Sequence, residues 1–277
     1  MTMARDIKTL RGEIDRLDRE IHDRLMRRAA VARDIGKIKN GLAFRPGREA
    51  KVLRALLARH HGPLPKTTIA HLWRETMSAM TRLQSRVALA LAAPNGDLAL
   101  ADLAREHFGL DVPLKFCGDA ETACRVVASG RAAVGLLPLA SSGPSAAWWT
   151  ALGPDVQVVA RLPFVASRGS SARTVGAVGV AQTEADPSGD DLTLLDWRVR
   201  DRASEAFMTR ALRTVGLRGR PVALAKLRGV RGASVLVEID GFLAADDERF
   251  GILRRAGGSA ILDLRRIGAY ARPLRVK

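Results

Sequence analysis

Residues 6–39 of the chain read DIKTLRGEIDRLDREIHDRLMRRAAVARDIGKIK, and this stretch decides the fold of the N-terminal third. Its apolar residues recur at a spacing of three or four, with charged residues between them: Leu10, Ile14, Leu17, Ile21, Leu25, Ala32 and Ile35. This spacing predicts one amphipathic helix of about 50 Å, at about 1.5 Å per residue. A helix of that length cannot bury its apolar stripe against itself. We therefore expect it to pack along neighbouring helices or along a second copy of the chain.

Two further helices are predicted downstream of this stretch. Asn40-Gly41 ends the first helix, and Pro46 stands where a new helix begins. The second helix is expected over Arg48–His60. The third is expected to start after Pro65, with Thr67 or Thr68 as its cap, and to continue to about Leu91. Residues 1–90 therefore read as an all-α domain of three helices.

The charge of the chain is concentrated in this helical part. The net charge is +16 over 277 residues, and residues 1–86 hold 20 Lys and Arg against 9 Asp and Glu. Such an excess attracts anions, and nucleic acid is one alternative. The segment lacks the interleaved aromatic residues of nucleic-acid surfaces, since Trp73 takes a predicted core position and Phe44 a loop. A small anionic partner is the favoured interpretation.

Composition also sets expectations about location and cofactors. We find no charged-then-apolar leader and no run of eighteen apolar residues, so we expect a cytoplasmic protein without a membrane partner. Cys117 and Cys124 are predicted to be buried thiols. His60, His61 and His71 lack the spacing of a zinc site, and neither a metal nor another cofactor is expected.

The rest of the chain reads as alternating strands and helices. A helix is expected around Leu98–His107, and the apolar run Ala132–Leu139 ends in a Ser/Gly/Pro-rich segment, Ser141–Ser145. A polar loop at Ala185–Asp191 separates an α/β region, residues 91–188, from an α+β domain, residues 189–277. That last domain is predicted to run strand (Leu192–Val199), helix (Glu205–Val215), strand (Val222–Leu227), strand (Ser234–Asp240), helix, strand (Ile261–Ile267).

Two cations in the long helix are the first candidates for chemistry. Arg28 and Lys39 lie eleven residues apart, close to three full turns, so they project from nearly the same face. Cations in a packed seam are costly unless an anion meets them. Alternatively, both side chains extend outward to solvent.

The order of motifs in this segment resembles a known family. The motifs are Leu10-Arg11-Gly12-Glu13-Ile14-Asp15-Arg16-Leu17-Asp18, Arg27-Arg28, Gly36-Lys37-Ile38-Lys39, Phe44-Arg45-Pro46-Gly47-Arg48-Glu49-Ala50, Gly62-Pro63-Leu64 and Leu72-Trp73-Arg74-Glu75-Thr76-Met77-Ser78-Ala79. Over about residues 5 to 86 they resemble the all-helical chorismate mutases, especially those fused to prephenate dehydratases. The resemblance implies an isomerase of aromatic amino-acid biosynthesis that converts chorismate to prephenate.

The resemblance also implies a role for each matching residue. Arg11, Arg28 and Arg48 would hold the two carboxylates of chorismate and nearby polar groups. Lys39 and Gln84 would donate to the breaking ether oxygen, and Glu49 would hold the ring hydroxyl. Arg28, Lys39 and Gln84 are thus the predicted catalytic residues. One position departs from the family, because Met80 replaces a common Ser and should remove a hydrogen bond near the substrate.

The implied chemistry suits these residue types. The rearrangement is pericyclic and needs no nucleophile or general base; it needs cations that hold a flexible dianion in its reactive shape and donors at the ether oxygen. Arg11 and Arg28 lie seventeen residues apart on one helix, about 25 Å by rise alone. Both can hardly reach one small dianion from the same chain, and the resemblance implies an intertwined homodimer with shared active sites.

The C-terminal two-thirds resembles the dehydratase half of such fusions in layout more than in motif. Phe242-Leu243, Asp246-Asp247 and Arg266-Ile267-Gly268-Ala269-Tyr270 resemble a regulatory ACT domain. The dehydratase Thr-Arg-Phe triplet is absent, with Gln182-Thr183-Glu184 in its place, and Ala140-Ser141 replaces the Glu-Asn of another motif. The phenylalanine-binding Glu-Ser-Arg-Pro signature is replaced by Ala225-Lys226-Leu227-Arg228.

We expect a chorismate mutase with a degenerate dehydratase-like and ACT-like region. A working bifunctional mutase–dehydratase and a catalytically weak regulatory homologue are the alternatives.

Overall fold

A computed structural model describes residues 6–38, 41–94, 96–139, 147–167, 176–200, 205–226 and 232–276. The chain divides into two compact units. The first contains the N-terminal helix up to Ala43, together with residues 79–86. The second contains Phe44–Ser78 and everything from Val87 onward. Lys39 and the Ser141–Ser145 run lie outside the described residues.

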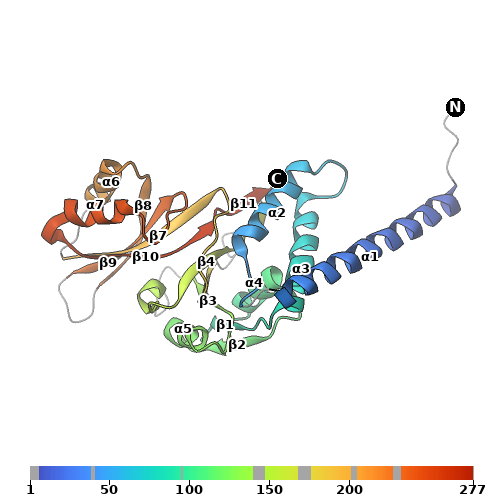
Figure 1. The fold of residues 1–277 in the computed structure, drawn as a ribbon, viewed down its shortest axis with the longest axis horizontal. Coiled ribbons are helices and arrows are strands. Elements are labelled where there is room, and N and C mark those ends of the chain that lie inside the picture. The colour runs from blue at the N-terminus through green and yellow to red at the C-terminus, as the bar shows by residue number, and fades with distance from the viewer. Residues whose placement is uncertain are drawn as a thin grey trace. The chain divides into compact units, whose positions relative to one another are not determined.

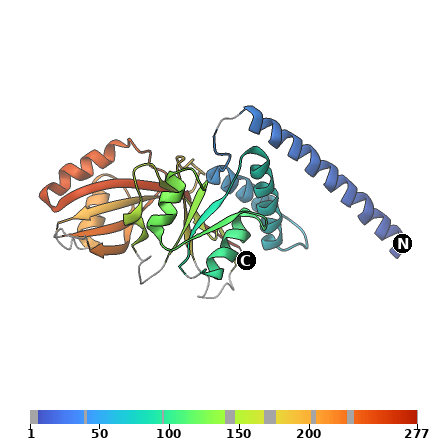
Figure 2. The same ribbon diagram turned by 90° about the horizontal axis from the view of Figure 1, so that it is seen from below.

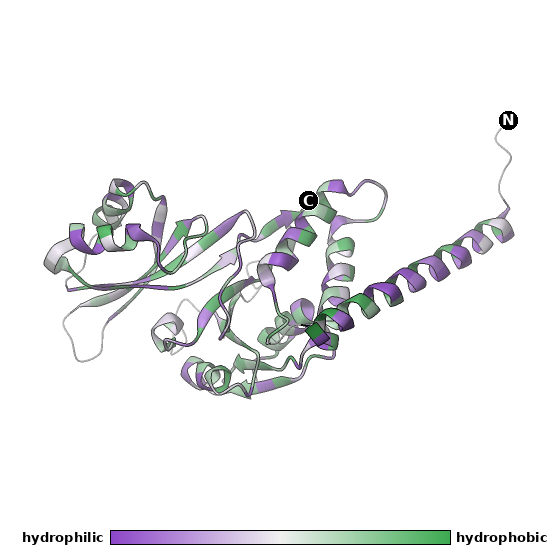
Figure 3. Cartoon of the chain, in the orientation of Figure 1, coloured by the Kyte–Doolittle hydropathy of each residue, from purple (hydrophilic) through white to green (hydrophobic). Residues whose placement is uncertain are grey.

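The first unit is dominated by helix α1, Ile7–Ile38, as the apolar spacing predicts (Figure 1). Ala32 is buried, whereas the apolar residues of the predicted stripe are largely exposed, and green and purple alternate along the helix in Figure 3. Near its end α1 meets the last turn of helix α3, where a β-carbon added at Gly36 would lie 2.8 Å from Gln84 Cα. Only a glycine permits this close approach.

The second and third helices begin close to where they were predicted. Helix α2 spans Pro46–Arg59, with proline in its first turn, and α3 spans Lys66–Gln84. The prediction that the third helix continues to about Leu91 is wrong. Leu89–Ala92 forms strand β1, which pairs in parallel with two neighbouring strands and is fully buried. A continuous apolar run suits the centre of a parallel sheet, where both faces are covered.

Within the second unit, α2 and the first part of α3 pack against strands rather than against each other alone. Their apolar side chains form one core with residues from three strands and with Phe164, which lies between two strands. Its members are Ala50, Leu53, Ala70, Met77, Phe164 and Ala271, with Val52, Trp73, Val165 and Leu274 at its margin. Phe44, just before α2, is buried, and the centroids of the Phe44 and Phe108 rings lie 5.2 Å apart.

The α/β region forms one half of a nine-stranded sheet. Its elements are α4 (Leu98–Phe108), β2 (Leu114–Cys117), α5 (Ala120–Ala128), β3 (Val134–Pro138), a 3-10 helix η1 (Trp148–Ala151), β4 (Gln157–Leu162), β5 (Val165–Ser167) and β6 (Ala177–Ala181). The strands lie in the order β2-β1-β3-β6-β4, with β1 parallel to both neighbours and β6 antiparallel to both of its own. The helix predicted at Leu98–His107 is confirmed as α4.

The last region has the predicted order of elements. They are β7 (Asp191–Val199), α6 (Glu205–Thr214), β8 (Gly219–Lys226), β9 (Ala233–Asp240), α7 (Glu248–Gly257), the short 3-10 helix η2 (Gly258–Ala260), β10 (Ile261–Ala271) and a final strand β11 (Leu274–Val276) that pairs with β5. The order β10-β7-β9-β8 is antiparallel throughout, a ferredoxin-like sheet.

The two halves of the sheet are continuous. Gly268 of β10 pairs with Val158 of β4, so the ferredoxin-like strands extend the α/β sheet (Figure 2). Alternate residues of the ferredoxin-like strands then face different cores. Leu194 packs with Trp148 and Trp149 of η1, whereas Leu195 packs with residues of α6 and α7. Across the described ranges, no helix is both long enough and apolar enough to span a membrane.

Candidate active site

Two predicted cations stand on α1, in the first unit. Arg11 and Arg28 are both exposed, and they lie seventeen residues apart on one uninterrupted helix, about 25 Å along its axis. Partial desolvation lowers the pKa of Arg28, although an arginine remains charged. The structure thus keeps these two residues apart within one chain.

Gln84 is the last residue of α3 and belongs to the same unit. Its side chain is half-buried beside Gly36, and its Nε2 donates to the carbonyl oxygen of Met80 at 3.1 Å. An amide nitrogen has two hydrogens, so one remains for another acceptor. Met80 itself is buried, with 8% of its surface exposed. The serine common in the family would offer a hydroxyl at this position, and here a thioether packs instead.

Arg48 and Glu49 lie in the first turn of α2, in the second unit. Arg48 is exposed, and Glu49 is nearly covered. Glu49 Oε2 accepts from Arg74 Nη1 of α3 at 2.8 Å, in an ion pair whose side chains are 13% and 7% exposed. One carboxylate oxygen of Glu49 is therefore already bound by Arg74. Glu49 is the residue that the family resemblance implies for binding the ring hydroxyl of the substrate.

The partners of Glu49 form a cluster that sequence reasoning missed. Arg74 Nη1 also lies 3.5 Å from His107 Nε2 of α4, and the Arg74 guanidinium stands 4.9 Å from the centroid of the Phe164 ring. Burial raises the pKa of Glu49 and lowers that of Arg74. Burial, then the charge of Arg74, lowers the pKa of His107 well below its ordinary value. Arg74 lies in the motif Leu72–Ala79, but nothing in the spacing of that motif indicates that it is buried.

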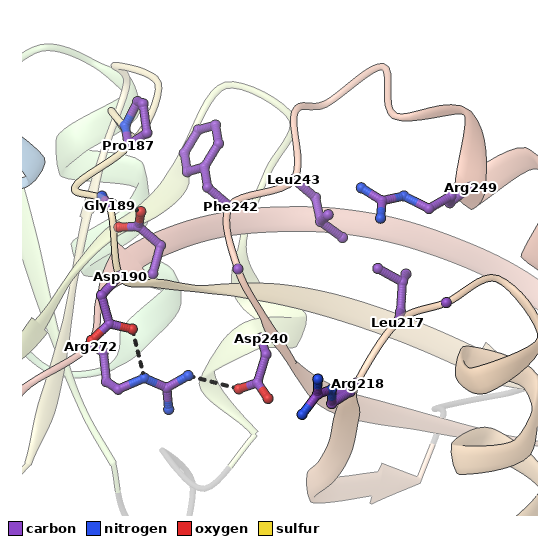
Figure 4. A pocket seen from close by; sticks show the side chains of 13 residues that line it. Pro187, Gly189, Asp190, Leu217, Arg218, Asp240, Phe242, Leu243, Arg249 and Arg272 are labelled. Carbon is purple, nitrogen blue, oxygen red and sulfur yellow. Dashed lines mark hydrogen bonds and ion pairs between the residues drawn. The ribbon is translucent and has the colours of Figure 1, made fainter.

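A cavity of about 680 Å³ lies in the ferredoxin-like region, outside the predicted mutase residues (Figure 4). Arg272 spans one wall and donates to Asp190 at 3.0 Å and to Asp240 at 2.7 Å. Arg218 and Arg249 also line it, with Phe242 and Leu243 providing apolar surface. Among the described residues, no group of three or more His, Cys, Asp or Glu is arranged to hold a metal ion.

Helices α1 to α3 lie almost entirely within a segment that matches a known protein family. Residues 10–85 match the family model of chorismate mutase type II. The N-terminal segment is therefore similar to the type II chorismate mutases. The match begins before Arg11 and ends after Gln84, so it covers the predicted site residues.

The chain is also similar to proteins named as bifunctional chorismate mutase/prephenate dehydratases. The chain is 32% identical over 150 residues to a bifunctional chorismate mutase/prephenate dehydratase of Stutzerimonas stutzeri, covering 51% of this chain and 41% of that protein. It is 31% identical over 144 residues to the protein of that name from Pseudomonas aeruginosa, covering 49% of this chain and 39% of that protein. The chain thus matches less than half the length of these relatives.

A solved structure extends the likeness to the fold of the rest. A prephenate dehydratase from Arthrobacter aurescens superposes with a TM-score of 0.50 at 14% identity, covering 69% of this chain and 93% of that one. The helical N-terminal segment is therefore followed by an α/β region with a large mixed sheet, whose fold resembles that of a prephenate dehydratase.

Proposed function

We propose that this protein converts chorismate to prephenate. The observation that carries the proposal is the match of residues 10–85 to the type II chorismate mutases. It is supported by the residue types at the matching positions: three arginines, a lysine, a glutamine and a glutamate, namely Arg11, Arg28, Arg48, Lys39, Gln84 and Glu49. These suit a dianion whose ether bond breaks without a covalent intermediate.

Each role follows from the charge that develops in the reaction. The arginines hold the two carboxylates and so restrict the substrate to its reactive shape. Lys39 and the free amide hydrogen of Gln84 donate to the ether oxygen, on which negative charge grows in the transition state. Removal of one such donor, as in Lys39→Ala, should lower kcat by about 10²- to 10³-fold.

The active protein is proposed to be a homodimer in which Arg11 of one copy completes the site of the other. The separation of Arg11 and Arg28 along α1 supports this arrangement. The apolar stripe of α1 supports it too, because Ile14 and Ile21 are 56% and 57% exposed. A second α1, running antiparallel, would bury that stripe and bring Arg11 to the far end of the neighbouring helix.

Loss of chorismate absorbance on addition of the purified protein tests the activity. An inert protein would overturn the proposal.

Sharing of the active site between two copies is tested by mixing two variants. Arg11→Ala and Arg28→Ala homodimers should each be nearly inactive, because every site in them lacks one cation. A mixed dimer has one site with both lesions and one with neither, so co-refolding should restore activity. Mixed dimers that stay as inactive as their parents would contradict the shared site.

The reaction is proposed to stop at prephenate. The dehydratase Thr-Arg-Phe triplet and Glu-Asn pair have no counterparts at the matching positions, which hold Gln182-Thr183-Glu184 and Ala140-Ser141. The ferredoxin-like region is proposed to be a degenerate ACT domain, on the strength of its strand order. Enzymatic formation of phenylpyruvate at neutral pH would instead favour the bifunctional alternative.

A further inference from the structure

Helix α2 begins without a capping side chain of its own. The N-cap position holds Arg45, whose side chain makes no capping hydrogen bond, and Pro46 follows. The first N–H groups of a helix have no partner within it, and a side chain outside must bind them. Because α2 starts in a buried setting, with Pro46 and Gly47 both covered, water cannot readily serve.

The missing cap comes from far along the chain. Asp186, in the loop before β7, accepts from Gly47 N through Oδ1 at 3.1 Å and from Arg48 N through Oδ2 at 3.0 Å. Arg45 adds an ion pair to the same carboxylate at 3.4 Å. A carboxylate is also favoured here by the positive end of the helix dipole. One aspartate therefore binds two backbone groups about 140 residues away.

The contact between the Asp186 loop and α2 is so close that it requires glycine at position 47. A β-carbon added at Gly47 would lie 2.1 Å from the backbone oxygen of Asp186. The loop thus lies directly against the first turn of α2. The Asp186 side chain is 14% exposed, so its hydrogen bonds are largely shielded from water.

A second anchor lies two turns further along α2. Arg54 Nη1 donates to the carbonyl oxygen and the hydroxyl of Ser188, at 3.2 and 2.8 Å. Its Nη2 donates to the carbonyl oxygens of Asp190 at 2.8 Å and Arg272 at 3.0 Å. Ser188 is held in turn by Asp191, which accepts from its backbone N–H at 2.9 Å. The loop is therefore held against α2 from Gly47 to Arg54.

We propose that Asp186 is a positioning residue for the mutase reaction. It binds the backbone N–H of Arg48, a predicted substrate ligand, and the next residue is Glu49. Asp186 acts through the first turn of α2 and does not touch the substrate. The inference rests on the proposed function. The dehydratase-like region would then be a structural part of the mutase, although it is proposed to have no dehydratase activity.

The test is steady-state kinetics of the full chain with chorismate. Asp186→Ala releases the first turn of α2 and should raise KM about three- to thirtyfold, the span that corresponds to loss of a helix cap, with a smaller change in kcat. Asp186→Asn keeps one acceptor oxygen and the capping preference but replaces the second acceptor with an NH2 group, so it should raise KM less than Asp186→Ala does. Should the alanine variant not fold, Asp186→Ser serves instead, since its shorter side chain cannot reach both N–H groups.

A matched control separates positioning from general loss of stability. Asp97 caps α4 in the usual way and accepts from Ala99 N at 2.9 Å, and α4 carries no predicted substrate ligand. Asp97→Ala should lower stability but leave KM unchanged. An equal rise of KM in both variants would overturn the inference.

A double-mutant cycle with Arg48 gives the sharpest outcome. If Asp186 acts by placing Arg48, Asp186→Ala should raise KM much less in an Arg48→Ala background than in wild type. Equal effects in both backgrounds, or a wild-type KM in Asp186→Ala, would overturn the inference. A wild-type protein inactive toward chorismate would refute the proposed function instead, so the two failures are distinguishable.

Discussion

Glu49 of α2 and Arg74 of α3 form a buried ion pair, with Oε2 and Nη1 2.8 Å apart. Burial disfavours the charge on both groups, and each offsets part of that cost for the other. The Phe164 ring under the Arg74 guanidinium and the neighbouring His107 complete the surroundings. The pair joins α2 to α3 independently of the apolar core.

Removing one partner of this ion pair should therefore lower the free energy of unfolding much more than removing both. Arg74→Met leaves a buried carboxylate without its cation and should lower the free energy of unfolding by roughly 3–5 kcal/mol. The double variant Glu49→Leu/Arg74→Met should recover most of that loss. Urea unfolding measures both. Arg16→Met, which removes an exposed pair with Glu20, is the control and should change stability by less than about 1 kcal/mol.

The stability of the protein should fall on mild acidification because of His107. The pKa of its ring is well below 6.5 in the folded state, so it is neutral there, while the unfolded chain binds a proton as the pH falls through 6.5. The unfolded state then binds more protons, and stability drops by up to about 1.4 kcal/mol per pH unit below that point. The contribution is present above pH 6.5 and absent in acid.

Glu49 acts in the opposite direction and must be separated from this effect. Its folded pKa is raised above 4.5, so stability falls as the pH rises from that value. The difference between wild type and His107→Gln cancels the Glu49 contribution. We expect that difference, measured by urea unfolding between pH 7.5 and pH 5, to shrink steadily below about pH 6.5. A constant difference would mean that His107 binds a proton in the folded protein at the same pH as in the unfolded chain.

Two glycines of α1 should respond oppositely to the same substitution. Gly36→Ala places a methyl group 2.8 Å from Gln84 Cα and should destabilise the contact of α1 with α3 by about 1–3 kcal/mol. Gly12→Ala meets no atom within 4 Å and should stabilise the helix by about 0.5–1 kcal/mol. Thermal unfolding of the two variants checks the pair. Equal effects would place Gly36 away from α3.

The pH dependence of the mutase should depend on Gln84. An amide donates at any pH, so the wild-type rate should be flat around neutrality. Gln84→Glu can donate to the ether oxygen only when protonated, so its activity should be lost as the pH rises through the pKa of the new carboxyl, ordinarily about 4.3. Rates of chorismate loss from pH 4 to pH 8 provide the measurement. A flat profile in the variant would remove Gln84 from the site.

Much of the secondary structure could be predicted because the local patterns agree with the final packing. The three-four spacing from Leu10 to Ile35 yields α1, and the β-α-β-β-α-β order of the last region appears as predicted. The error at Leu91 arose because an apolar run after a helix suits either state. Its resolution depends on pairing of Leu89–Ala92 with strands from elsewhere in the chain, which a local pattern cannot reveal.

The candidate site was predictable in its residue types and not in its surroundings. Arg48 and Glu49 could be named from their motif, but their partners Asp186 and Arg74 could not. Asp186 lies in a polar loop of ordinary composition, and its distance from Gly47 along the chain hides the contact. Predictions of the six substrate ligands and of the domain limits at residues 90 and 188 remain predictions.

The aspartate cap of α2 has a consequence for the order of synthesis. Gly47 leaves the ribosome 139 residues before Asp186 does, which at about 5–20 residues per second is a delay of roughly 7–30 s. During that interval the nascent chain holds a helix whose first turn has no partner for its N–H groups. The first turn of α2, although translated early, therefore acquires its cap only after Asp186 has been synthesised. A chain truncated before residue 186 lacks this aspartate and cannot form the same hydrogen bonds to the first turn of α2.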